Sequence, residues 1–234
     1  METQLSECIG HFLFNEEKGI DNSWILKPVN MTRSMDMIVT DNIDQIIRNV
    51  ETGPKICQKY LNKPFLFKNR KVDLRFIILL KKLVPLELYM YDKVFWVRVA
   101  NKDFNLDSLN LNDYERHFTV MNYNKDVKMQ QVFNTDFLEY LKQNNIEWNV
   151  IYDKIKQAVK DTFITAAINC PQMTDYYARS IYGLDIMLDE NLQPYVLEFN
   201  FSPDCTRACK FTPEFFNDIF STLFLNEDSG VTKI

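Results

Sequence analysis

The chain has 234 residues, of which 46% are hydrophobic and 25% charged, and its formal net charge is -5. This length supplies one substantial core or two closely packed lobes. The acidic balance argues against a nucleic-acid-binding protein, which usually carries a concentrated basic patch, and no apolar run reaches the roughly 18 residues that a membrane span needs.

The N-terminal third alternates between helical and extended patterns. Residues 4–19 are predicted to form a helix, and Trp24–Leu26 a short buried strand that ends at Lys27-Pro28. Thr40 or Asp41 is expected to cap a second helix. A further strand is predicted over Lys55–Leu61.

The middle of the chain is the clearest β region. Three segments rich in Ile, Leu, Val and aromatic residues follow one another with short breaks: Lys71–Leu80, Leu86–Tyr91 and Val94–Ala100. An antiparallel meander is the simplest arrangement of these strands. Residues 101–130 are mostly irregular and polar, and helical spacing returns at Phe133–Leu141 and Val150–Ile168.

The last part of the chain contains a hairpin and a final helix. Tyr182–Leu188 and Pro194–Phe199 flank a polar turn, which is typical of two antiparallel strands. Pro213 begins a helix over Glu214–Leu225, in the first turn where proline is tolerated. The whole pattern predicts an α+β fold with a largely antiparallel sheet and packed helices.

The hairpin carries the most informative polar residues. Because side chains alternate along a strand, Glu198 and Asn200 share one face, and Asp185 lies opposite them on the partner strand. Two carboxylates and an amide oxygen then converge, and magnesium prefers such hard ligands. The alternative is a hairpin with a polar solvent face, but a carboxylate between apolar neighbours needs a partner.

A second polar set lies on the first strand of the β region. Lys71, Asp73 and Arg75 share one face, where two cations suit a polyphosphate and a guanidinium can bind phosphoryl oxygens bidentately. A solvated edge with ion pairs along the strand is the alternative. Lys27 could also reach phosphates, or it could be a strand-end lysine with its tip in solvent.

A third segment has a weaker signal. The exposed backbone at Gln58, Lys59, Tyr60 and Leu61 could hold an adenine edge by main-chain hydrogen bonds. A plain strand end explains the same residues. These segments gain meaning from their order along the chain.

In that order they resemble the tubulin–tyrosine ligase family of ATP-grasp enzymes. The family pattern is W-I-x-K-P, Q-K-Y, K-F-D-x-R and a hairpin G-x-D-x-M-L-D-x-N…L-E-V-N-x-S-P. The chain matches it at Trp24–Pro28, Gln58–Tyr60, Lys71–Arg75 and Gly183–Pro203. The resemblance implies an ATP-grasp-type fold, with residues 1–62 as a remnant of the central lobe, residues 63–234 as the C-terminal lobe, and the N-terminal lobe missing.

The resemblance also implies the site and its cofactors, ATP and Mg²⁺. The nucleotide would contact Lys27, the hinge Gln58, Lys59, Tyr60 and Leu61, and the strand residues Lys71, Asp73 and Arg75. Magnesium would be held by Asp185, Glu198 and Asn200. Catalytic roles fall to Arg75 at the terminal phosphate, to Arg98 at the acceptor peptide, and to Asn122.

Two motifs depart from the family pattern. Active members carry an R-G-x-G-I loop that lets backbone approach the phosphates, whereas this chain has Arg33-Ser34-Met35-Asp36-Met37, with no glycine and an added carboxylate. The family's L-T-N motif becomes Val120-Met121-Asn122. We therefore expect an ATP- and magnesium-binding domain that is weak or inactive as a ligase and acts on tubulin modification by binding. An active ATP-dependent ligase, joining an amino acid to a protein tail such as that of tubulin, is the alternative.

Cysteine usage and the N-terminus bear on location. Five Cys at irregular spacing argue against a disulfide framework and favour a reducing compartment, where the thiols would be structural. The first residues lack the pattern of a signal peptide. We therefore expect a cytoplasmic protein whose partner is tubulin or another protein tail, with no nucleic-acid or membrane partner.

Overall fold

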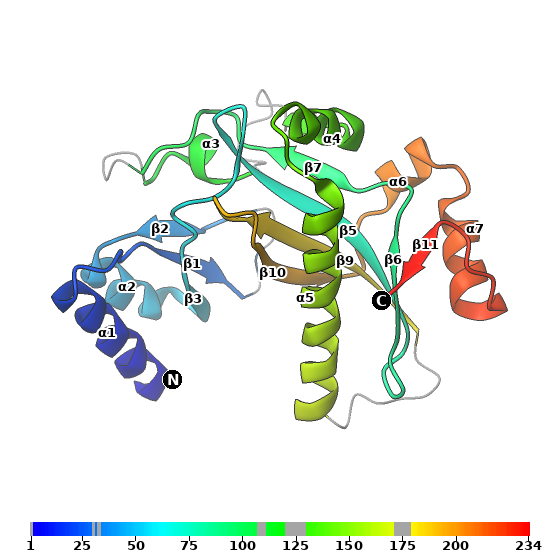
Figure 1. Cartoon of the computed structure of the whole chain (residues 1–234). Coiled ribbons are helices and arrows are strands. Elements are labelled where there is room, and N and C mark those ends of the chain that lie inside the picture. Colours follow the sequence, from blue (N-terminus) through cyan, green and yellow to red (C-terminus); the bar gives the residue numbers. More distant parts are fainter. Residues whose placement is uncertain (1, 30, 32–33, 107–110, 120–129, 171–178) are drawn as a thin grey trace. The chain divides into compact units, whose positions relative to one another are not determined.

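The structure is a computed structural model that describes residues 2–29, 31, 34–106, 111–119, 130–170 and 179–234 (Figure 1). These residues form two compact units. The first comprises Met1–Lys71 and Val99–Gln130, and the second comprises Val72–Arg98 and Gln131–Ile234. Both combine helices with antiparallel strands, so the predicted α+β class is confirmed.

The first unit is built on a three-stranded antiparallel sheet of order β2-β1-β3. The strands are β1 (Trp24–Pro28), β2 (Ile38–Thr40) and β3 (Lys55–Lys59). The helices are α1 (Glu2–Glu17), α2 (Ile43–Asn49) with a 3-10 extension over Val50–Thr52, and α3 (Tyr114–His117), and a short strand β4 (Leu66–Phe67) pairs with the start of β5.

Each face of this small sheet has its own apolar cluster. On one face, Phe12 of α1, Leu26 of β1 and Ile46 of α2 pack together, so α1 and α2 both cover this face. On the other face, Ile25 lies in a cluster that includes Tyr60. Alternation along β1 therefore sends Ile25 and Leu26 to opposite sides, as expected for a buried strand.

The cap of α2 differs from the prediction. Asn42, not Thr40 or Asp41, caps the helix: its Oδ1 accepts the backbone N–H groups of Asp44 at 2.8 Å and Gln45 at 3.3 Å. Thr40 is the last residue of β2, and its hydroxyl accepts the N–H of Asn42 at 3.0 Å. The helix thus begins after a polar Thr-Asp-Asn run in which the last residue is the one in position to cap.

The second unit contains a larger antiparallel sheet with the order β10-β9-β5-β6-β11. Its strands are β5 (Arg70–Lys82), β6 (Glu87–Tyr91), β9 (Ser180–Leu188), β10 (Pro194–Phe201) and β11 (Val231–Lys233). In addition, β7 (Trp96–Val99) pairs with β5 and with β8 (Gln130–Val132). The predicted meander is therefore wrong, because β7 pairs with β5 and not with β6, and β11 was not anticipated.

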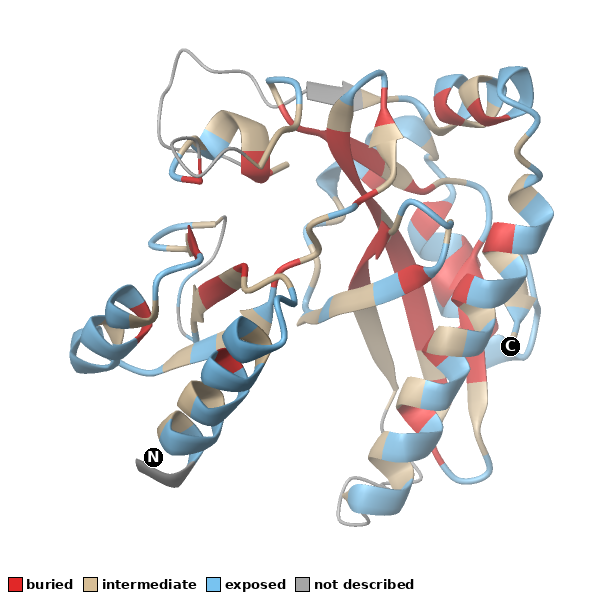
Figure 2. Cartoon of the chain, turned by 60° about the vertical axis from the view of Figure 1, so that its left-hand side comes forward, coloured by how far each residue is buried: buried red, intermediate tan, exposed pale blue. Residues whose placement is uncertain are grey.

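Helices cover both faces of this sheet. The set is α4 (Asn134–Gln143), α5 (Trp148–Asn169), α6 (Thr206–Phe211) and α7 (Phe215–Phe220), which continues as a π-helical turn over Ser221–Leu225. Phe76 of β5 packs against Tyr152 of α5, whereas Ile77 packs in a cluster with Phe215 of α7. Successive residues of β5 thus meet α5 on one side and α7 on the other, and both faces of β5 are buried (Figure 2).

The long helix α5 was predicted well. Five apolar side chains spaced four residues apart were expected on one face. Ile151, Ile155, Val159 and Phe163 are buried, whereas Ala167, near the end of the helix, is half-buried. None of the helices that the structure describes is both long enough and apolar enough to cross a bilayer.

Candidate functional site

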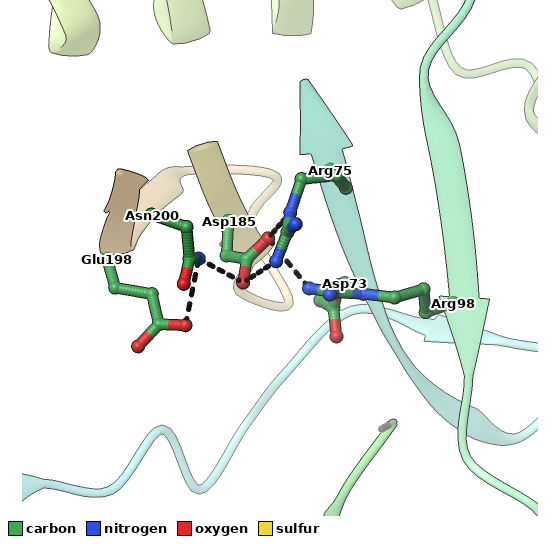
Figure 3. A network of polar contacts seen from close by, with 6 residues as sticks. All are labelled: Asp73, Arg75, Arg98, Asp185, Glu198 and Asn200. Atoms are coloured by element: carbon green, nitrogen blue, oxygen red, sulfur yellow. Dashed lines mark hydrogen bonds and ion pairs between the residues drawn. The ribbon is translucent and has the colours of Figure 1, made fainter. Parts of the chain in front are cut away.

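The second unit brings the predicted acidic residues to three neighbouring strands. The register pairs Arg75 of β5 with Asp185 of β9, and Asp185 with Glu198 of β10. Residues directly opposite in an antiparallel pair point to the same face. Arg75, Asp185 and Glu198 therefore share a face of the sheet (Figure 3).

Two arginines converge on Asp185. The guanidinium of Arg75 donates to both carboxylate oxygens, through Nε to Oδ1 and through Nη2 to Oδ2 at 2.7 Å. Arg98, from β7, places Nη2 2.8 Å from Oδ1 of the same carboxylate and donates from Nε to Asp73 Oδ1 at 2.5 Å. Asp73, Arg98 and Asp185 are all buried. The predicted site is therefore a network in which two arginines face two buried carboxylates.

The charges of this network set its protonation. Burial alone would raise the pKa of Asp185, but the hydrogen bonds and positive charges of Arg75 and Arg98 outweigh burial and hold that pKa below its usual value. Burial by itself would lower the pKa of Arg98, but the negative charges of Asp73 and Asp185 outweigh burial and raise that pKa above its usual value. Both groups are thus charged, and each depends on the other for compensation in a buried setting.

Asn200 links the network to Glu198. Its Nδ2 donates to Glu198 Oε1 at 3.0 Å and lies 3.4 Å from Asp185 Oδ2 (Figure 3). Asp185 is buried whereas Glu198 is exposed, so the cluster runs from the interior to the surface. The hairpin with a purely polar solvent face, the alternative reading of these residues, is therefore wrong for Asp185.

A β-bulge makes this convergence possible. Val196 pairs with Ile186, but Glu198 pairs with Asp185, so Leu197 is the extra residue. Without the bulge, Leu197 would lie opposite Asp185 and Glu198 would point to the other face. The bulge thus brings the second carboxylate to the first.

The donor set fits magnesium in kind. The ion usually takes one or two carboxylates and completes its shell with water and phosphate oxygens. Asp185 and Glu198 supply two carboxylates, and a half-turn of the Asn200 amide would present Oδ1 in place of Nδ2. Among the residues that the structure describes, no group of three or more His, Cys, Asp and Glu side chains forms a self-sufficient metal site. A metal here would therefore need ligands from elsewhere and would share Asp185 with the arginines.

Gly183 provides room for Arg75. A Cβ at this position would lie 2.9 Å from Pro203 Cβ and 3.1 Å from Arg75 Nη1. The arginine side chain therefore lies over the glycine on its way to Asp185. This contact gives a physical role to the glycine of the G-x-D segment.

The first unit holds the other predicted nucleotide residues. Gln58 pairs with Ile25 in the β1–β3 ladder, and Lys59 pairs its ammonium with Asp21 Oδ2 at 3.1 Å. Lys27 is half-buried at the end of β1, and Leu61, which is also half-buried, follows β3. The role of these residues in binding adenine or phosphates stays a prediction.

Lys71 and Tyr60 form a buried polar chain in the first unit. Lys71 Nζ donates to Tyr60 Oη at 2.6 Å and lies 4.0 Å from the centroid of that ring. Tyr60 Oη is 3.0 Å from Nδ1 of His117, which was not among the predicted site residues. Lys71 is 3% exposed, so the alternative of a solvated edge is wrong at this position.

The segment Ser34–Met37, which stands where the family has its R-G-x-G-I phosphate loop, has an unusual backbone and is called the phosphate loop below. Ser34 has φ 59° and Asp36 has φ 54°, which place both residues in the left-handed region. These are the two positions where the family pattern has glycine, and left-handed backbone is the conformation that glycine adopts at little cost. The loop thus keeps a glycine-like conformation with side chains in place. Arg33, and the predicted catalytic Asn122 with Val120 and Met121, lie outside the described residues.

The chain belongs to the tubulin-tyrosine ligase family, whose model matches residues 1–232. It is 42% identical to the mouse tubulin–tyrosine ligase-like protein 12 over its whole length, and 41% identical to the human protein of that name over 98% of its length. It is 29% identical to tubulin glycylase 3E of Tetrahymena thermophila over 92% of its length. The chain covers 39%, 38% and 17% of these relatives, so it spans about two-fifths of the first two.

Proposed function

We propose that this chain is an ATP- and magnesium-binding tubulin–tyrosine ligase-like domain that is weak or inactive as a ligase and acts on tubulin modification by binding. The observation that carries this proposal is the network of Asp73, Arg75, Arg98, Asp185 and Asn200 with Glu198 at its rim. It combines hard oxygen ligands with two fixed guanidinium groups, which suits a metal–polyphosphate.

The residues divide into two roles in this proposal. Asp185, Glu198 and Asn200 would hold magnesium, and Arg75 would bind a phosphoryl group when the metal takes over its carboxylate. By resemblance, Lys27, Lys71, Asp73 and the hinge Gln58–Leu61 would contact the nucleotide. When bound, Mg-ATP supplies an activated phosphoryl group. In this chain Arg75 and Arg98 would offset its negative charge, because both are already aimed at the carboxylate that the metal would share.

Weak ligase activity is inferred from the phosphate loop. Backbone N–H groups approach phosphates closely only where side chains leave room, and Ser34 and Asp36 add side chains at both glycine positions. The Asp36 carboxylate would also repel a phosphate. Binding would persist through the metal and arginine contacts, whereas positioning of the transferred group would suffer.

An active ligase that joins an amino acid to a protein tail is the second candidate. The presence of Asp185, Glu198 and Asn200 together favours it, because a ligase needs a metal to stabilise the transferred phosphoryl group, whereas a domain that acts by binding alone does not. Tubulin is the proposed partner because the relatives' names refer to it. A cytoplasmic location is proposed because all five cysteines are free.

Titration calorimetry of the 234-residue chain with Mg-ATP tests the binding proposal. We expect Glu198→Gln to weaken Mg-ATP binding by at least about tenfold, equivalent to about 1.4 kcal/mol, with no change in melting temperature because Glu198 is exposed. Glu227→Gln, an exposed glutamate whose hydrogen bonds are made by its backbone, is the matched control. No binding heat and no melting shift with Mg-ATP would remove the nucleotide from the proposal.

Incubation with ATP, tubulin and labelled tyrosine or glutamate separates the two candidates. If the proposal is correct, the chain binds nucleotide, but it incorporates no more labelled amino acid into tubulin than the control sample without ATP does. Incorporation that disappears in Glu198→Gln and persists in Glu227→Gln would establish the active ligase instead.

A further inference from the structure

Two cysteines from distant parts of the sequence meet in the first unit. Cys8 lies in α1 and Cys57 in β3, and their Sγ atoms are 3.4 Å apart. Both thiols are free and both residues are half-buried. A small oxidant can therefore reach a thiol pair that already lies side by side.

The packing of α1 on the sheet holds the pair together. Cys8 and Phe12 are four residues apart on one face of α1, and both pack in the cluster that includes Leu26. Cys57 pairs with Leu26 in the ladder and points to this same cluster, whereas its neighbour Ile56 is 54% exposed. The thiols thus meet across a defined helix–sheet contact.

We propose that Cys8 and Cys57 are a redox modification site at which an intramolecular disulfide fastens α1 to β3. The bond length of a disulfide is about 2.05 Å, so the sulfur atoms need to approach by only about 1.4 Å. Small side-chain rotations can supply such a shift at half-buried positions. The oxidant is a low-molecular-weight disulfide such as oxidised glutathione.

The exchange balances in two steps. The Cys8 thiolate attacks a sulfur of oxidised glutathione, which forms a mixed disulfide and releases one glutathione thiolate. The Cys57 sulfur then attacks the Cys8 sulfur, its proton goes to solvent, and the second glutathione thiolate leaves. Two protein thiols are oxidised and one glutathione disulfide is reduced to two thiols.

The order of attack follows from the environment of Cys57. Burial, together with the neighbouring Cys8, raises the pKa of the Cys57 thiol to about 12. Cys57 is therefore protonated near neutral pH and is the poorer first nucleophile. In the second step, Cys57 and the mixed disulfide at Cys8 belong to the same molecule and lie close together. This high effective concentration offsets the small fraction of Cys57 that is thiolate.

The bridge would change how the first unit is held. Cys57 immediately precedes Gln58, the first residue of the predicted hinge, on a strand at the edge of the sheet. A covalent link between this strand and the N-terminal helix would close a long loop of the chain and restrict the unfolded state. Oxidation would thus stabilise the first unit reversibly.

Non-reducing peptide mapping of the intact chain tests the proposal. The native protein is incubated with oxidised glutathione, free thiols are alkylated, and the peptides are analysed by mass spectrometry. We expect a Cys8–Cys57 cross-linked peptide that forms in wild type and in Cys170→Ser, and is absent from Cys8→Ser and Cys57→Ser. The oxidised protein should melt about 5 °C higher or more, and a reductant should reverse the shift.

Two results would overturn the proposal. One is that Cys8 and Cys57 are both found alkylated, and so were still reduced, in a sample whose other thiols have been oxidised. The other is a mixture in which Cys8 and Cys57 pair as often with Cys170, Cys205 or Cys209 as with each other, which would mean unfolding before oxidation. Because the wild-type cross-link is read directly, neither result depends on whether a serine variant folds.

Discussion

Arg98 Nη2 lies 2.8 Å from Oδ1 of Asp185, so a carboxylate expected to bind metal is already paired with a buried cation. Arg75 makes a second, two-pronged contact with the same group. A carboxylate in this setting cannot be left uncompensated. The arginines therefore keep the site charge-balanced without ligand, and a metal that binds Asp185 would free guanidinium groups for phosphate.

Replacing Arg98 with Met should destabilise the second unit by about 3–5 kcal/mol, because Asp73 and Asp185 would each lose a buried partner. Urea unfolding followed by circular dichroism measures this loss. Lys102→Met removes an exposed lysine that pairs with Asp113 and Glu115, and it should leave the unfolding midpoint unchanged. Equal effects of the two substitutions would mean that the Arg98 network adds nothing beyond a surface pair.

Replacing Gly183 with Ala should cost about 1–3 kcal/mol of unfolding free energy, because the new methyl group would collide with Pro203 and displace Arg75. Gly10→Ala is the matched control, since nothing lies within 4 Å of the added carbon in helix α1. That control should stabilise the protein by about 0.5–1 kcal/mol. A Gly183→Ala protein as stable as wild type would show that Arg75 does not depend on the space above the glycine.

Regular patterns in the sequence were enough to predict much of the fold. The apolar residues spaced four apart along α5 predicted that helix, and the turn residues Asp189–Asn191 predicted the hairpin around them. The partner of β7 depends on contacts between distant segments, which local patterns do not contain. The three-residue β11 is too short to give a pattern of its own.

The sequence predicted that Asp185, Glu198 and Asn200 come together, but it did not predict the geometry that joins them. Alternation along a regular strand suggested that Asp185, Glu198 and Asn200 share a face, yet Glu198 faces Asp185 only because of the bulge at Leu197. The burial of Lys71 depends on Tyr60 and His117, which lie far from it in the sequence. The arginine pairs of Asp185 likewise come from β5 and β7, and no spacing rule would have identified them.

Restoring glycine at Ser34 and Asp36 tests the phosphate loop. If the proposed function is correct, Ser34→Gly/Asp36→Gly should strengthen Mg-ATP binding several-fold, because two side chains and one negative charge would leave the loop. Stability should change by less than about 1 kcal/mol, since glycine relieves the left-handed backbone but gives the unfolded chain more freedom. Calorimetry measures the affinity. Met35→Gly, at the position between them, is the control, and an equal gain there would refute the argument.

Removing the Tyr60 hydroxyl should loosen the first unit. Tyr60→Phe deletes an oxygen that bonds both Lys71 and His117, so we expect a loss of about 1–3 kcal/mol in urea unfolding. Tyr195→Phe, at a position 45% exposed, should change stability by less than about 0.5 kcal/mol. If Tyr60→Phe lowered the free energy of unfolding no more than this control, the Tyr60 hydroxyl would not stabilise the fold through Lys71 and His117.

Acid should weaken the second unit through Asp185. Folding lowers the pKa of Asp185 below its ordinary value of 3.8. The stability that Asp185 contributes is therefore complete above the pKa of the unfolded chain, and it is lost as pH falls through the pKa of the folded protein. We therefore expect the free energy of unfolding to decrease as pH falls from about 5 to about 3. Asp185→Asn should be less stable than wild type at pH 7 and should lose less stability over that range. Asp153→Asn, whose side chain is 71% exposed, should follow the wild-type slope. Urea midpoints measured across this pH range give the three slopes, and an Asp185→Asn slope as steep as that of wild type would assign the acid sensitivity to other carboxylates.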